Sequence, residues 1–171
     1  MDLETIKLFS LYNKTTNAKM NKFISTLSNE QWEKKFDCFF PSVKSLCNHI
    51  YATDINWLKR FSTLREFRFI KHDVFKKEIK FGEVVIGGTE QYLQSRVELD
   101  EIIEQFANEL TAEDLTKRLK YKDPYGNEHD NPFGGMILHM FNHETHHRGM
   151  ISVYLEQLGM ENDYSNLSAI F

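Results

Sequence analysis

Apolar residues recur at helical spacing along four long stretches of the chain, and each stretch is predicted to form a helix that buries one face. In the third stretch the predicted buried stripe is Tyr92, Leu93, Val97, Leu99, Ile102, Ile103 and Phe106. The four predicted helices span residues 3–27, residues 42–64, residues 89–110 and a final segment from about Pro132 to Gly159.

The ends of these segments carry residues that commonly start or stop helices. Ser42 and Thr89 can each accept a hydrogen bond from the first helical turn, so both are predicted N-caps. Ser28 and Gln31 have the capping-box spacing, which predicts a short helical turn after the first helix. Gly159 is a suitable C-terminal stop, because glycine adopts the left-handed conformation found after many helices.

The connections between the helices differ in length and character. Residues 65–88 are mixed and charged and end at Gly87-Gly88, so we expect a long crossover with little regular structure. Residues 118–130 contain the turn signal Asp123-Pro124-Tyr125-Gly126-Asn127, which predicts a small hairpin before the last helix. We therefore expect one all-α domain over residues 1–171, a four-helix bundle with a long crossover and a small hairpin.

Composition and charge narrow the possible functions. The formal charge of −4, from 21 basic and 25 acidic residues without a long run of one sign, gives no electrostatic footprint for nucleic acid. Two cysteines, Cys38 and Cys47, are too few for a disulfide framework, and no leader peptide is apparent. No apolar stretch approaches the roughly 18 residues needed to cross a bilayer. These features favour a soluble cytoplasmic protein.

Candidate chemistry gathers in the last predicted helix, where four of the seven histidines lie between residues 139 and 147. His143 and His147 are one helical turn apart and can both bind one cation. His139 cannot join them, because it lies roughly 12 Å from His147 along the helix axis. The pair therefore needs a third ligand from another part of the chain.

The segment His143-Glu144-Thr145-His146-His147 also satisfies H-E-x-x-H, the metalloprotease motif in which the glutamate is the general base. The extended form of that motif continues with glycine and a third histidine, but Met150 and Val153 occupy those positions. The third ligand is therefore expected upstream, where the candidates are His49, His72 and His129. His49 alone lies on a predicted long helix, so we select it.

Two carboxylates are candidates for a catalytic role. Asp54 falls in the middle of the second apolar stripe, where an unpaired charge is costly, so it should have a histidine or arginine partner. It can serve the structure or orient a ligand histidine. Glu144 can be a surface residue, a general base or a partner of a ligand histidine.

Taken together, Asn48-His49-Ile50, Asp54, Trp57 and the segment from His143 to Gly149 resemble the DinB family of small, damage-inducible bacterial proteins, also called YfiT-like. The resemblance extends to Tyr12 and Asn13 in the first helix. It implies a four-helix bundle, usually a homodimer, with zinc or nickel held by residues that match His49, His143 and His147. The family commonly has glutamine where this chain has Met150.

Three functions stay open. Some members of the family are transferases or isomerases that use low-molecular-weight thiols such as bacillithiol or mycothiol. The resemblance therefore implies a metal-dependent enzyme, with a thiol S-transferase acting on a small electrophile as the leading hypothesis. Because three neutral ligands leave coordination positions open on the metal, a hydrolase that activates water is an alternative. A non-catalytic metal-binding bundle is the third.

Overall fold

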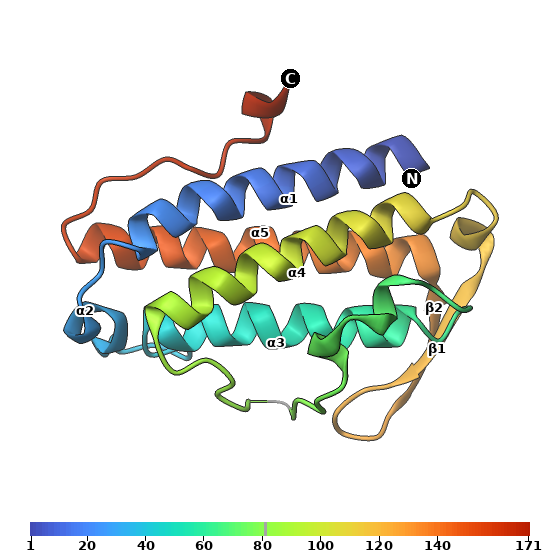
Figure 1. Ribbon diagram of the computed structural model, residues 1–171, viewed down its shortest axis with the longest axis horizontal. Helices are drawn as coiled ribbons and strands as arrows, with labels where there is room; N and C mark the ends of the chain where they lie inside the picture. Colours follow the sequence, from blue (N-terminus) through green and yellow to red (C-terminus); the bar gives the residue numbers. More distant parts are fainter. Residues whose placement is uncertain (81) are drawn as a thin grey trace.

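The computed structural model describes residues 1–80 and 82–171; Phe81, in the predicted crossover, lies outside them. It consists mainly of helices, which confirms the predicted four-helix bundle (Figure 1). The four long helices are α1 (Leu3–Ile24), α3 (Val43–Phe61), α4 (Thr89–Glu109) and α5 (Phe133–Gln157), and the predicted short turn is α2 (Asn29–Glu33).

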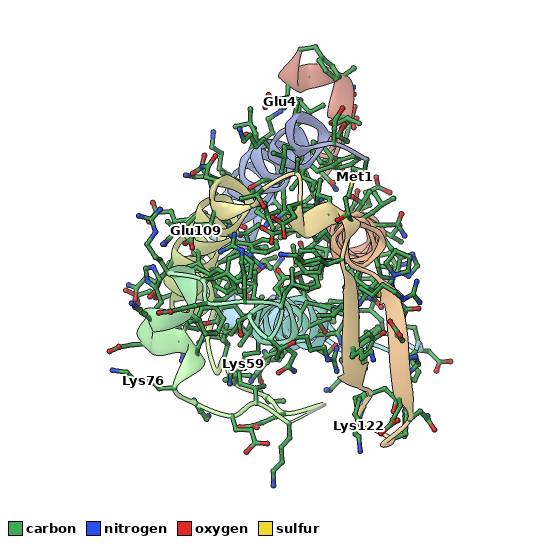
Figure 2. All side chains as sticks on the ribbon, turned by 90° about the vertical axis from the view of Figure 1, so that its right-hand side faces the viewer. Met1, Glu4, Lys59, Lys76, Glu109 and Lys122 are labelled. Carbon is green, nitrogen blue, oxygen red and sulfur yellow. The ribbon has the colours of Figure 1, made fainter. Side chains whose placement is uncertain are left out.

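Each long helix packs against two others: α1 contacts α4 and α5, and α3 contacts the same two helices. Figure 2 views the bundle nearly end-on and shows side chains filling the space between the helices. In Figure 1, α3 and α4 run in one direction and α1 and α5 in the other. The parallel pair α3 and α4 requires the long crossover, because the chain must return to the starting end of the bundle between them.

The crossover contains more order than predicted. It includes two short 3-10 helices, η1 (Phe69–Lys71) and η2 (Asp73–Phe75). The buried Phe69 ring lies 5.3 Å from Phe106 of α4, centroid to centroid. Near its end the crossover is held against α3 by Asn48, whose Oδ1 accepts hydrogen bonds from the backbone of Val85 and Ile86 at 2.8 Å.

The predicted hairpin is confirmed. A 3-10 helix, η3 (Asp114–Thr116), leads into strand β1 (Arg118–Lys122), which pairs antiparallel with β2 (Glu128–Pro132). Gly126 has a φ of +86°, a value that glycine adopts without strain, at the turn between the strands. Because β1 contacts both α3 and α5, the hairpin lies beside the two helices that carry the candidate ligands.

Most helix ends follow their sequence signals. Ser28 and Ser42 form capping boxes, and Gly159 has a φ of +83° directly after Leu158, the C-cap of α5. The prediction that Thr89 caps the third helix is wrong: Thr89 is the first helical residue, and Gly88 occupies the N-cap position without a side-chain hydrogen bond. The first helix ends at Ile24, earlier than the predicted residue 27.

The buried face of α4 differs from the predicted stripe at one important place. Val97 is 53% exposed, so its assignment to the core is wrong. Arg96 and Asp100 are buried instead, and they lie one helical turn apart between Tyr92 and Ile103. The prediction failed because it counted only apolar residues as buried, whereas this face combines apolar and ionised side chains.

The chain after α5 forms an extended segment and a last short turn, η4 (Leu167–Ile170). Buried Tyr164 fixes this segment to the bundle by donating its hydroxyl to the Arg148 carbonyl at 2.7 Å. Among the described residues, none of the helices combines the length and hydrophobicity that a membrane span requires.

Candidate metal centre

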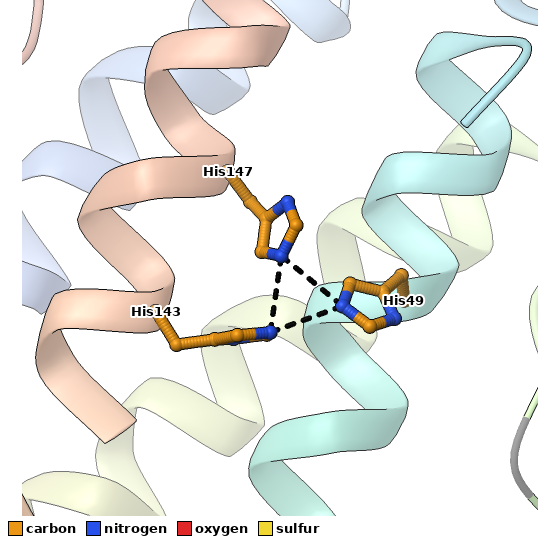
Figure 3. A group of neighbouring side chains, drawn as sticks. All are labelled: His49, His143 and His147. Atoms are coloured by element: carbon orange, nitrogen blue, oxygen red, sulfur yellow. Dashed lines mark hydrogen bonds between the residues drawn. The ribbon is translucent and has the colours of Figure 1, made fainter. Parts of the chain in front are cut away.

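The three candidate ligands come from two adjacent antiparallel helices. His49 lies in the first half of α3, which begins at the capping box of Ser42. His143 and His147 lie one turn apart on α5. Figure 3 shows the imidazole rings from the two helices pointing toward a common space. The sequence prediction that His49, His143 and His147 converge is thus matched by the geometry of the described chain.

The three Nε2 atoms form a nearly equilateral triangle. The separations are 3.0 Å between His49 and His143, 3.1 Å between His49 and His147, and 3.0 Å between His143 and His147. Nitrogens bonded to one ion at about 2.0 to 2.1 Å lie at most about 4.2 Å apart, so these distances fit a shared ion. Hydrogen bonds fit less well, because each neutral ring has only one N–H and one acceptor nitrogen. The group could therefore bind a metal ion.

The protonation of the three rings favours metal binding. Burial, together with the neighbouring histidines, lowers the pKa of His143 to about 4 and that of His147 to about 3. Burial also lowers the pKa of His49, although the negative charge of Glu144 partly opposes this shift. Metal binding requires the neutral imidazole. All three rings are therefore in the binding form at neutral pH.

The other histidines lie outside this triangle. His139 packs its ring 5.2 Å from Trp57, and His146 is exposed. His72 lies 2.9 Å from Gln105, and His129 lies 3.1 Å from Asp123 in the hairpin. Selecting His49 from a predicted helix therefore gave the residue that the fold brings to His143 and His147.

Phe40 was not identified from the sequence, although it covers part of the site. Its ring centroid lies 4.5 Å from that of His49 and 5.2 Å from that of His147. It belongs to the segment between α2 and α3, where Cys38 lies 2.7 Å from the Tyr154 hydroxyl. An apolar cover excludes water from one side of the imidazoles. No periodic pattern marks this segment, so only the fold could show its position.

Asp54 has the arginine partner predicted for it. Arg96 of α4 donates to Asp54 Oδ2 at 2.7 Å and to Asp100 at 2.8 Å, and all three side chains are at least 96% buried. Burial, followed by the nearby charge of Glu144, raises the pKa of Asp54 well above its usual range. Asp54 therefore favours its neutral form more than an exposed aspartate does.

Glu144 lies in the same buried network and is not a surface residue. Its Oε2 accepts a hydrogen bond from Arg148 at 3.0 Å, and its Oε1 lies 3.6 Å from Arg96. Arg148 also donates to Asn13 of α1, so the network links all four long helices. Burial opposes the ionisation of Glu144, but Asp54 and the two arginines outweigh it and lower the pKa. A carboxylate enclosed in this way does not occupy the open position that an H-E-x-x-H general base needs.

Two cavities open beside the histidines. The larger, of 640 Å³, includes His49, His143, Trp57 and Arg60 in its wall. The smaller, of 230 Å³, includes His49, Phe39, Phe40, Ala52 and Val84 in its wall. The two cavities share four lining residues: His49, Thr53, Asn56 and Lys80. The larger cavity therefore borders two of the three histidines, and the smaller borders His49.

The fold and the site define a class: helical-bundle proteins with a three-histidine group that could bind a metal ion. Comparison with known proteins is more specific. The model of the DinB family matches residues 1–168. The chain belongs to the DinB family.

Individual relatives agree with this assignment. The chain is 25% identical over 155 residues to Protein DinB of Bacillus subtilis strain 168, a match that covers 86% of this chain and 83% of that protein. The crystal structure of the DinB-like protein YjoA from Bacillus subtilis is similar in fold, with a TM-score of 0.62 at 15% identity. That similarity covers 91% of this chain and 94% of YjoA.

Proposed function

We propose that this protein is a metal-dependent enzyme in which His49, His143 and His147 bind a divalent ion, zinc or nickel. The convergence of three neutral Nε2 atoms within 3.1 Å of one another is the observation that carries the proposal. Three uncharged ligands preserve the full charge of a dication and leave positions open for a substrate. A metal held in this way supplies Lewis-acid chemistry, lowering the pKa of a thiol or water that it coordinates.

The leading reaction is transfer of a low-molecular-weight thiol to a small electrophile. Such a reaction needs space for two substrates beside one centre, and the two cavities that share His49 support it. The thiol sulfur forms a bond to the electrophilic carbon, the leaving group departs with its electron pair, and the thiol proton passes to solvent. Phe40 and Ala52 give the smaller cavity an apolar wall suited to an uncharged electrophile.

Glu144 and Asp54 are proposed to position and polarise the site. Neither side chain is accessible to solvent, and both are bonded to arginines. Because the charge of Glu144 raises the pKa of His49 and His143, it strengthens their donor nitrogens. Glu144→Gln is expected to weaken metal binding, by up to about 10- to 100-fold if Glu144 acts as an outer-shell partner does. Metal titration of this variant, with urea unfolding measured in parallel, separates the effect from lost stability.

Metal analysis of the purified protein and of His49→Ala tests the metal site. We expect one equivalent of zinc or nickel in the wild type and loss of most of it in the variant. His139→Ala is the matched control, since it removes a nearby histidine outside the Nε2 triangle. A wild-type protein without stoichiometric metal would refute the proposal.

Thiol conjugation to a chlorinated electrophile, with and without chelator, tests the reaction. A panel of ester, amide and phosphate substrates tests the alternative, a hydrolase that uses the same three histidines. If the protein is a non-catalytic bundle, the wild type shows only background rates with all of these substrates. His49→Ala then lowers the melting temperature and leaves those rates unchanged.

The family also suggests a homodimer, a cytoplasmic location and a role in stress response. We propose these as expectations of membership. Light scattering coupled to gel filtration tests the dimer, fractionation of cells tests the location, and expression measured after DNA damage tests the stress response.

A further inference from the structure

The larger cavity has a cationic side chain at the end away from the histidine triangle. On α3, His49, Thr53, Asn56 and Arg60 all line this cavity. Residues 49 and 60 are eleven positions apart, which is close to three full turns and about 16 Å along the helix axis. The cavity therefore extends along one face of α3 from the candidate metal centre to Arg60.

The guanidinium of Arg60 packs against two aromatic rings. Its Cζ lies 4.7 Å from the Trp57 ring centroid and 5.2 Å from the Tyr121 ring centroid. Stacking on rings restrains the flexible side chain and leaves the N–H groups at the guanidinium edge available. Arg60 is thus oriented before any ligand arrives.

No carboxylate in the described part of the chain forms an ion pair or hydrogen bond with this guanidinium. Asp123 exerts electrostatic attraction on Arg60, but its carboxylate accepts a hydrogen bond from the Asn127 side chain and lies 3.1 Å from His129. Guanidinium groups that are half-buried usually have such a partner, because burying an unpaired charge is costly. The donors of Arg60 are therefore open to an external anion.

The remaining charges around the cavity also favour an anion. Lys59 and Lys80 line it together with one acid, Glu78. The ammonium of Lys59 donates a hydrogen bond to the Lys77 carbonyl. Of the three cations that line the cavity, Arg60 is the one with a planar guanidinium, which can donate two parallel hydrogen bonds. Carboxylates and phosphates match that fork geometry.

We propose that Arg60 binds an oxyanion, a carboxylate or a phosphate, at the end of a small substrate that lies along α3. The substrate's reactive atom would lie near His49 and His143, so this second part rests on the proposed function. The anion-binding part depends only on Arg60 and its surroundings. The enzyme would accordingly select elongated anionic molecules over neutral ones of the same shape.

Calorimetric titration with matched aromatic probes tests this assignment. Benzoate and phenyl phosphate represent the two oxyanion sources, and benzamide is the neutral analogue of benzoate. We expect at least one anion to bind the wild-type protein at least about tenfold tighter than benzamide, as charge-assisted hydrogen bonds of this kind allow. The anion that binds more tightly shows whether the natural ligand carries a carboxylate or a phosphate.

Variants locate the binding. Arg60→Gln is expected to abolish the preference for the anion, and Arg60→Lys, which keeps the charge without the fork, to weaken it. Arg60→Lys supplies the comparison if Arg60→Gln does not fold. Arg68→Gln is the control, because it removes the same charge from a side chain that is 82% exposed. The preference should persist in this control.

A carboxylate can also bind a metal directly, so the titrations are repeated on chelated protein and on His143→Ala. If the anion still binds to the chelated protein and to His143→Ala, its binding site is at Arg60. Three results would overturn the inference. The preference for the anion over benzamide could be lost in chelated protein or in His143→Ala, it could persist in Arg60→Gln, or it could be absent from wild type. Metal content of the same samples reports separately on the proposed function, since metal-free protein can still bind the anion.

Discussion

Replacing Arg96 with methionine should be among the most damaging single substitutions in this chain. The change removes the partner that lies 2.7 Å from Asp54 and 2.8 Å from Asp100, and it leaves both carboxyl groups buried. Removing one partner of a buried ion pair typically costs about 3 to 5 kcal/mol. Because a domain is stable by only about 5 to 15 kcal/mol, the variant should lose a large share of its free energy of unfolding.

Urea unfolding and thermal unfolding, both followed by circular dichroism, measure this loss. For a domain of this size, 1 kcal/mol corresponds to about 2 to 4 °C, so the melting temperature should fall by roughly 6 to 20 °C. Arg68→Met is the control; its side chain is 82% exposed and its ion pair with Glu109 is long, at 4.0 Å, so the change should cost no more than about 1 kcal/mol.

A double variant separates the cost of the stranded carboxyl group at Asp54 from the cost of lost packing. Asp54 forms its hydrogen bond with Arg96, so Asp54→Leu combined with Arg96→Met removes both groups. The double variant should therefore be more stable than the sum of the two single losses predicts. If Arg96→Met costs less than about 1 kcal/mol, or if the two losses simply add, the reasoning about the buried network is refuted.

Three further predictions concern other parts of the molecule. Burial opposes ionisation of Asp114, but hydrogen bonds led by the one from Arg65 lower the pKa of its carboxyl group. The ionised Asp114 should therefore stabilise the fold fully above about pH 5, and this stabilisation should fade as the pH falls below the ordinary aspartate pKa of about 3.9. Urea titrations of Asp114→Asn should accordingly show a deficit of about 1 to 3 kcal/mol at pH 7 that shrinks toward pH 3; a constant deficit would contradict this. A Cβ at Gly149, exposed within α5, would meet no atom within 4 Å, so Gly149→Ala should raise stability by about 0.5 to 1 kcal/mol in thermal melts, and a loss would show that this face is covered. Zinc at 100 times its dissociation constant should stabilise wild type by about 2.7 kcal/mol in calorimetric melts, and His147→Ala should remove most of that gain.

The sequence predicted the helices and the His143–His147 pair because both follow local rules. Apolar spacing defines the helices, and the one-turn separation of His143 and His147 needs no tertiary information. His49 could be selected because it lies on a predicted long helix. The need for a partner at Asp54 also followed from its place in an apolar stripe.

The features that the sequence did not predict depend on contacts between distant segments. Arg96 and Glu144 look like ordinary surface residues of a helix until the packing of α4 and α5 encloses them. The cover formed by Phe40 lies in a segment without periodic pattern. The stacked position of Arg60 requires Tyr121 from the hairpin, which no local rule brings to α3.

The unequal origin of the three histidines has a consequence for folding. Two come from a single turn of α5, whereas His49 is separated from His143 by 94 positions in the chain. An ion bound by all three would act as a reversible cross-link that closes this long loop. In the chain-entropy model for a covalent cross-link, a loop of that length restricts the unfolded chain by about 4 to 5 kcal/mol. The α5 pair could bind metal as soon as its helix forms, and docking of α3 would then complete both the centre and the bundle.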